Sequence, residues 1–307
     1  SHLEMLKKVE YSFDVFRKLK EFCDKEKILF LSTPFDHESA DFLDDLVPIF
    51  KLSSGEVTNL PFIEYISRKK KPIILSTGMS TLEEVERAVN MIKKHHVDDP
   101  DDGYAPLTIL HCTTNYPCPY EDANLRALRT LSNVTGLPVG YSDHTLGIDV
   151  SLASAAMGAE VIEKHFTLDK NMQGPDHKAS IEPDELKQLV ANVRDIERQL
   201  KGKTENLNED DLKVMLSSLV DNAGDVEKSM GNEEKKPTRN ELNIMKIARK
   251  SLVVARNLKK GEIIEKDMFV IKRPGEGIQP SEAAAAIGRE LVHDKKEDEN
   301  LFWEDLR

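Results

Sequence analysis

The sequence predicts an α/β protein with a parallel β-sheet, followed by a small C-terminal domain of short strands. Short apolar runs of strand length alternate with amphipathic stretches of helical periodicity, at a spacing of roughly 20 to 35 residues. Each run ends in hydroxyl, amide or charged residues, which is typical of the functional edge of parallel α/β folds. Tandem βα units of this kind form one parallel sheet through right-handed crossovers. Six such runs are present, at residues 28–31, 49–52, 72–75, 107–112, 139–141 and 161–165.

Amphipathic stretches precede and separate these runs. Residues 2–27 carry leucine, phenylalanine and valine at helical spacing among lysines and glutamates, which predicts a helix before the first run. Ser80-Thr81-Leu82-Glu83-Glu84 has the pattern of a capping box and predicts a helix that reaches Lys94. The other expected helices cover residues 36–46, 59–67, 124–131 and 148–157.

The composition divides the chain into three parts. Residues 1–200 hold the six βα units, and residues 246–307 form the second domain, with strands expected at 251–254, 262–264 and 268–271. Residues 201–245 are rich in charge and in helix breakers around a helical pattern at 209–227. We interpret this middle part as a solvated, partly helical linker.

Length, charge and cysteine content indicate a soluble protein. The chain has 307 residues, 39% of them hydrophobic and 32% charged, and its net charge of −12 disfavours nucleic acid and anionic membranes as partners. No apolar run approaches the roughly 18 residues of a membrane-spanning helix, and the first residues contain no secretory signal. The three cysteines form no C-x-x-C pair, which favours a cytoplasmic location.

Two histidines follow neighbouring strands of the predicted sheet. His144 lies in Gly140-Tyr141-Ser142-Asp143-His144-Thr145, and His165 in Glu163-Lys164-His165-Phe166. Two neutral imidazoles at adjacent strand ends can share a divalent metal, although a single strand-end histidine is more often a hydrogen-bonded core residue. We expect His111 to be such a structural residue.

The side chain of Lys164 is expected on the face of its strand opposite to those of Glu163 and His165. There a lysine must be paired, so we expect a carboxylate partner, either Glu163 or Asp143.

Six motifs lie at or after the predicted strand ends: Ser32-Thr33-Pro34-Phe35, Leu75-Ser76-Thr77-Gly78-Met79-Ser80, His111-Cys112-Thr113-Thr114-Asn115-Tyr116-Pro117, residues 140–147, residues 163–168 and Gly174-Pro175-Asp176-His177-Lys178-Ala179-Ser180. Together they closely resemble the sialic acid synthases, which condense phosphoenolpyruvate with N-acetylmannosamine or a related hexose. The C-terminal segments 249–255 and 272–278 are similar to the antifreeze-like (SAF) domain that these enzymes carry. The resemblance covers nearly the whole chain except about residues 201–236.

The resemblance implies a TIM-type (β/α) barrel that is incomplete at its N-terminal side. The family's barrel has eight strands, and its first two carry a glutamate, an asparagine-histidine pair and a lysine that have no match here. Six units leave two open sheet edges, which are costly to expose. Either the sequence is truncated or a partner supplies the missing wall.

The resemblance also implies how the strand ends bind phosphoenolpyruvate, a trianion near neutral pH. Lys51 would supply a cation, and Thr33, Ser54 and Ser76 would donate hydrogen bonds to carboxylate and phosphate oxygens. Ser142 is placed with these substrate-binding residues. Taken singly, a polar residue at a strand end is more often a turn or a helix cap.

The metal and the proton-transfer groups follow from the same resemblance. His144 and His165 would hold Mn²⁺, or Mg²⁺ or Co²⁺, with positions left open for the aldehyde oxygen of the sugar and for water. Glu56 and Asp176 would stabilise a cationic centre at the former enol carbon or move the proton of the attacking water.

Two sets of residues are expected to contact the sugar. Asn115 and Tyr116 supply an amide and a phenol, and Tyr116 is also a catalytic candidate; alternatively both form a turn before Pro117. In the family the residue matching Arg273 reaches the acetamido end of the sugar in the barrel of the partner subunit, which implies a domain-swapped homodimer. Without the resemblance, Arg273 reads as a surface-loop residue.

The predicted function is therefore the condensation of phosphoenolpyruvate with an N-acetylated hexose, giving a nonulosonic acid and phosphate. The stretches around Asn115 and Asp176 are more similar to the sialic or legionaminic acid branch than to the pseudaminic one. The alternatives are a metal-dependent aldolase or hydrolase on the same barrel and a catalytically impaired sugar-binding protein.

Overall fold

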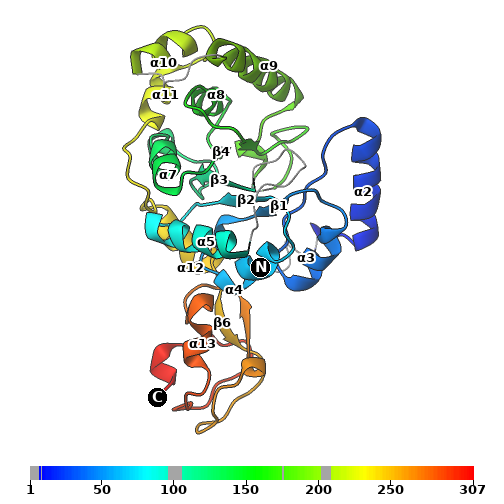
Figure 1. Cartoon of the computed structure of the whole chain (residues 1–307), viewed down its shortest axis with the longest axis vertical. Helices are drawn as coiled ribbons and strands as arrows, with labels where there is room; N and C mark the ends of the chain where they lie inside the picture. The colour runs from blue at the N-terminus through cyan, green and yellow to red at the C-terminus, as the bar shows by residue number, and fades with distance from the viewer. Residues whose placement is uncertain (1–6, 8, 96–105, 175, 202–208) are drawn as a thin grey trace.

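The computed structural model describes residues 7, 9–95, 106–174, 176–201 and 209–307. A curled parallel sheet of five strands, covered on its outer face by helices, lies above a small C-terminal domain (Figure 1). The strands pair in the order in which they occur in the chain, so every crossover leads to the neighbouring strand. They are β1 (Phe50–Leu52), β2 (Ile73–Ser76), β3 (Leu107–Cys112), β4 (Val139–Asp143) and β5 (Ile162–Lys164).

The helices enclose one apolar core between themselves and the sheet. All six residues of β3, the central strand of the sheet, are buried. The predicted capping box is confirmed, because the side chains of Thr81 and Glu84 each bond the backbone N–H of the other. The helices are α2 (Phe13–Glu26), α3 (His37–Asp44), α4 (Leu60–Ser67), α5 (Leu82–His95), α6 (Tyr120–Ala123), α7 (Ala127–Thr135), α8 (Asp149–Ala156) and α9 (Pro183–Leu200).

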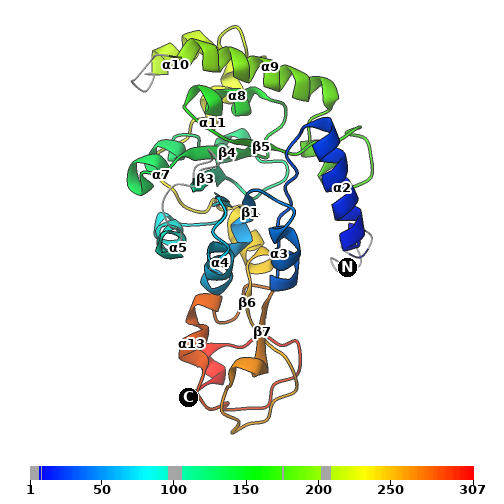
Figure 2. The same cartoon turned by 45° about the vertical axis from the view of Figure 1, so that its right-hand side comes forward.

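The first predicted strand is wrong, so the six-unit barrel becomes a five-stranded half-barrel. Residues 28–31 form no strand, and the side chains of Ile28 and Leu29 are 64% and 57% exposed. An apolar run becomes a buried strand only where neighbours cover both its faces, and here β1 is the sheet edge. The preceding helix α2 buries no residue and stands beside the sheet, touching α3 through stacking of Phe13 on Phe42 (Figure 2).

Three helices connect the two domains: α10 (Glu209–Leu216), α11 (Ala223–Ser229) and α12 (Glu241–Ala248). Leu212, Met215 and Leu216 of α10 join the core of the α/β domain, and α11 packs against α6 and α8. This part of the chain therefore lies against the barrel helices.

The C-terminal domain has its own core around one antiparallel pair, β6 (Ser251–Val254) and β7 (Phe269–Lys272). The strand expected at 262–264 is wrong, since only Ile263 makes an isolated bridge, to Glu290. Within the described residues, no helix is both long and apolar enough to cross a membrane.

Candidate active site

A chain of polar side chains crosses the carboxyl edge of the curled sheet, which we call the mouth. Lys51 Nζ of β1 donates to Ser76 Oγ of β2 at 2.7 Å and lies 3.4 Å from Glu163 Oε2 of β5. Ser142 Oγ of β4 donates to the other oxygen of Glu163 at 2.7 Å. Because β1 and β5 are the two edge strands, the contact between Lys51 and Glu163 shows that the curl of the sheet brings its edges together across the mouth.

The two predicted histidines face each other at the mouth. The imidazole centroids of His144 and His165 are 5.4 Å apart, with the rings inclined at 73°. Strand register explains this placement: Ser142 pairs with Glu163, so the residues two positions later, His144 and His165, point to the same face.

His144 is held as a neutral ring, with Ser142 Oγ 3.5 Å from Nε2 and the carbonyl oxygen of Thr113 at Nδ1. Its Nδ1 lies 2.7 Å from the carbonyl oxygen of Thr113, which only accepts, so Nδ1 carries the hydrogen and Nε2 the lone pair. Burial lowers the pKa of His144, and the neighbouring His165 acts in the same direction, against the hydrogen bond to Thr113. A neutral imidazole with a lone pair is the form that binds metal.

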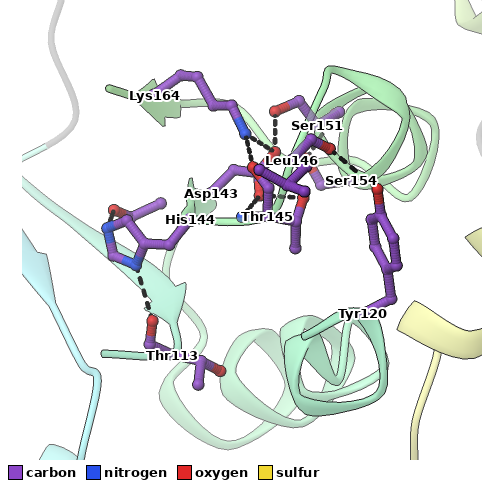
Figure 3. A network of polar contacts seen from close by, with 10 residues as sticks. Thr113, Tyr120, Asp143, His144, Thr145, Leu146, Ser151, Ser154 and Lys164 are labelled. Carbon is purple, nitrogen blue, oxygen red and sulfur yellow. Dashed lines mark hydrogen bonds and ion pairs between the residues drawn. The ribbon is translucent and has the colours of Figure 1, made fainter. Parts of the chain in front are cut away.

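A buried charge network fixes the end of β4 on the opposite face of the sheet (Figure 3). Lys164 Nζ lies 2.9 Å from Asp143 Oδ2 and donates to the carbonyl oxygen of Thr145 at 2.6 Å. Thr145 and Ser151 donate further hydrogen bonds to the same carboxylate. The expectation that Lys164 is paired is confirmed, with Asp143 as the partner. This network holds the backbone on both sides of His144.

Tyr116 covers the two histidines. Its ring centroid lies 4.2 Å from that of His144 and 5.3 Å from that of His165. Burial raises the pKa of Tyr116, and nearby acidic groups including Asp176 raise it further, so the phenol stays protonated as a donor. Asn115 is half-buried beside it, and Asp176 is exposed.

Ser54 is half-buried in the turn that follows β1. Its Oγ accepts a hydrogen bond from Gly78 N at 2.9 Å and lies 3.2 Å from Cys112 Sγ. Thr33 is half-buried in the segment that precedes α3. The structure therefore brings Lys51, Ser54 and Ser76 to one side of the mouth.

Two predicted site residues make contacts between the α/β domain and the C-terminal domain. Glu56 is 1% exposed, and its two carboxylate oxygens contact Lys250 Nζ at 2.8 Å and Asn59 Nδ2 at 2.7 Å. Arg273 is exposed, and its guanidinium lies over the ring of Phe35 at 5.6 Å from the centroid. Neither residue joins the polar chain of the mouth described above.

His111 is structural, as predicted. Its Nε2 lies 2.8 Å from the carbonyl oxygen of Ala123, and burial lowers the pKa of His111 to about 3.

The sequence analysis missed two residues of the mouth, Glu163 and Thr113. Strand alternation could have found Glu163, because it shares the face of His165 two positions later. Thr113 contributes a backbone oxygen to His144, and no side-chain pattern reveals such a contact.

The donor set at the mouth fits a divalent ion with open positions. The ring of His144 lies 5.4 Å from that of His165, between centroids, and the hydrogen bond to Thr113 orients it as outer-shell contacts of metal sites do. Among the residues that the structure describes, no group of three His, Cys, Asp or Glu side chains is arranged to hold an ion. The protein would therefore supply two imidazoles and leave the other positions to substrate and water.

Comparisons with known proteins agree with this architecture. A model of the NeuB family matches residues 1–205, and a model of the SAF domain matches residues 249–307. The chain is 43% identical to the N,N'-diacetyllegionaminic acid synthase of Campylobacter jejuni, covering 97% of this chain and 79% of that protein. The corresponding Legionella pneumophila enzyme is 41% identical, covering 99% and 76%, and human N-acetylneuraminate-9-phosphate synthase is 31% identical, covering 96% and 73%.

Two solved structures have the same fold. The spore coat polysaccharide biosynthesis protein SpsE of Bacillus subtilis superposes with a TM-score of 0.81 at 30% identity, covering 97% of this chain and 78% of that one. The N-acetylneuraminic acid synthetase of Leptospira borgpetersenii gives 0.60 at 36% identity, covering 69% and 72%.

Proposed function

The chain belongs to the NeuB family, and from this membership we propose that it condenses phosphoenolpyruvate with an N-acetylated hexose, using a divalent metal ion. The products are a nonulosonic acid and inorganic phosphate. The observation that carries the proposal is the mouth itself, where one lysine with hydroxyl donors lies opposite two facing histidines.

The lysine side of the mouth suits the enol phosphate. Lys51 is 9% exposed, and its only carboxylate contact among the described ion pairs is the 3.4 Å approach of Glu163, which a phosphate or carboxylate of the substrate can replace. Ser76 and Ser54 supply hydroxyls on the same side. Charge-assisted hydrogen bonds from this set would bind a trianion more strongly than a neutral analogue.

The histidine side of the mouth suits the sugar aldehyde. An ion held by His144 and His165, which we propose to be Mn²⁺, Mg²⁺ or Co²⁺, would polarise the aldehyde oxygen. Tyr116, whose pKa is raised, can donate to a sugar oxygen beside the reacting carbon, and Asn115 can contact the N-acetyl group.

The reaction joins the methylene carbon of the enol to the aldehyde carbon, adds water at the former enol carbon and releases phosphate by cleavage of the C–O bond. A carboxylate is needed to take up the proton of that water. Asp176 is the better placed of the two candidates, because it is exposed and close enough to Tyr116 to raise its pKa. Glu56 is buried with both oxygens engaged.

We further propose a legionaminic or sialic acid precursor as acceptor, in agreement with the 43% and 41% identity to the two legionaminic acid synthases. Arg273 is assigned to the sugar site of a second subunit in a swapped homodimer. In support, its side chain is exposed and belongs to the C-terminal domain, outside the polar chain of its own mouth.

Phosphate release tests the proposal. Phosphoenolpyruvate is incubated with and without N-acetylmannosamine and Mn²⁺, using the chain, His144→Ala and a control variant, His293→Ala, whose imidazole lies in the C-terminal domain against Asp305. We expect release that requires sugar and metal, is lost in His144→Ala and is retained in His293→Ala. Release without sugar, or equal release by the His144 variant, would refute the proposed function.

A further inference from the structure

One carboxylate, Glu241, ties together turns that follow two different strands of the sheet. Its Oε1 accepts hydrogen bonds from the backbone N–H groups of Met79, at 2.8 Å, and Thr114, at 2.7 Å. Met79 follows β2 and Thr114 follows β3, while Glu241 begins α12. The side chain is 98% buried, since its exposed fraction is 2%. Two charge-assisted hydrogen bonds in such a site hold both turns in one arrangement.

Met79 is the residue under most backbone strain in this cluster. Its φ is 58°, in the left-handed region that a residue with a side chain occupies only at a cost, and its side chain is buried. Charged side chains bond both backbone groups of Met79: Glu241 accepts from its N–H, and Arg249 Nη2 donates to its carbonyl oxygen at 2.7 Å. Arg249 is itself fixed by two bonds to the carboxylate of Glu84. The strained turn is therefore imposed from the segment that leads into the C-terminal domain.

The turn at Met79 contacts the side of the mouth that holds Lys51. Gly78, next to Met79, donates its N–H to Ser54 Oγ at 2.9 Å. The fit is so close that a Cβ at Gly78 would lie 2.3 Å from Thr114 Oγ1. Ser76, two residues before Gly78, is the hydroxyl that accepts from Lys51. A shift of Met79 would thus move Ser54 and Ser76 relative to Lys51.

We propose that Glu241 is a positioning residue for the binding of phosphoenolpyruvate. By holding the turns after β2 and β3, Glu241 keeps Lys51, Ser54 and Ser76 together as one anion-binding group. This inference rests on the function proposed above. Helix α12, which connects the two domains, would then also contribute to the affinity for the substrate.

The chain offers a control that separates this role from ordinary helix capping. Glu241 also caps its own helix, since Oε2 accepts from Thr238 N at 2.8 Å and Thr238 Oγ1 accepts from Glu241 N at 3.3 Å. Thr238→Ala removes one half of that capping box and leaves the bonds to Met79 and Thr114 in place. Glu241→Ala removes both functions.

The test measures phosphoenolpyruvate binding by calorimetry in these variants, together with hydrogen exchange at the amides of Met79 and Thr114. We expect Glu241→Ala to weaken binding by at least about tenfold and to speed exchange at both amides by a similar factor. Thr238→Ala should stay within about threefold of the parent in both measurements.

Two results would overturn the proposal: parent-like affinity and exchange in Glu241→Ala, or an equal loss of affinity in Thr238→Ala. If the parent chain binds no phosphoenolpyruvate, the proposed function fails, and the exchange data still decide whether Glu241 holds the two turns. Unchanged protection of Met79 and Thr114 in Glu241→Ala would then refute the positioning role by itself.

Discussion

Replacing Lys164 by methionine should destabilise the protein strongly, because it leaves the carboxylate of Asp143 buried without its cation. The two side chains are 4% and 0% exposed, with 2.9 Å between Lys164 Nζ and Asp143 Oδ2. Removing one partner of such a pair costs about 3–5 kcal/mol. Thr145 and Ser151 still donate to the carboxylate, so we expect a value near 3 kcal/mol. Against a typical total of about 5–15 kcal/mol, this is a large fraction of the folding free energy.

Urea denaturation measures the loss, with two matched variants. Arg194→Met breaks the pair with Glu197, whose side chains are 63% and 54% exposed, and should cost only about 0–1 kcal/mol. Asp143→Asn combined with Lys164→Met removes both charges and should recover at least half of the loss. A cost for Lys164→Met no larger than that for Arg194→Met would refute the reasoning, as would a double variant less stable than the single one.

Three further predictions concern a histidine, a glycine and a lysine. The pKa of His111 in the folded protein is about 3, below the value near 6.5 in the unfolded chain. The stability that this difference contributes is therefore present above about pH 6.5 and is lost as the pH falls toward 3. In urea titrations, His111→Gln should flatten this decline of stability with falling pH. Gly78→Ala places a Cβ 2.3 Å from Thr114 Oγ1 and should cost about 1–3 kcal/mol, or more if the turn cannot shift. Lys51→Met should weaken phosphoenolpyruvate binding at least about tenfold in calorimetry.

Each of these predictions has a result that would contradict it. For His111, the contrary outcome is an unchanged pH dependence in the variant. For Gly78, it is a denaturation midpoint equal to that of the parent. For Lys51, parent-like affinity would show that the cation of the mouth takes no part in binding.

Of the six strands that local sequence patterns predict for the parallel sheet, five are present in the structure. The alternation of side chains along a strand also predicts which residues lie on each of its faces. The contrast between His165 at the mouth and Lys164 in the buried network follows from a period of two residues. The strand predicted at residues 28–31 is absent, although the composition of this segment is typical of a strand. Its burial would require a neighbouring strand that the fold does not provide.

Contacts between distant parts of the chain lie beyond such patterns. Glu56 reads as a catalytic carboxylate at a strand end, but Lys250 from the other domain occupies one of its oxygens. Glu241 lies in the predicted linker, and its contact with Met79, 162 positions away in the sequence, follows only from the folded structure. Long-range pairs of this kind are set by the folded chain and leave no local sequence pattern.

Product analysis by mass spectrometry tests the central claim most directly. The chain is supplied with phosphoenolpyruvate, N-acetylmannosamine and Mn²⁺, and the sugar-derived products are compared with those of His165→Ala. We predict a nine-carbon acid formed in equal amount with phosphate by the chain and absent with the variant. Failure to form this acid, or its formation at the same rate by His165→Ala, would contradict the assignment of the condensation to this mouth.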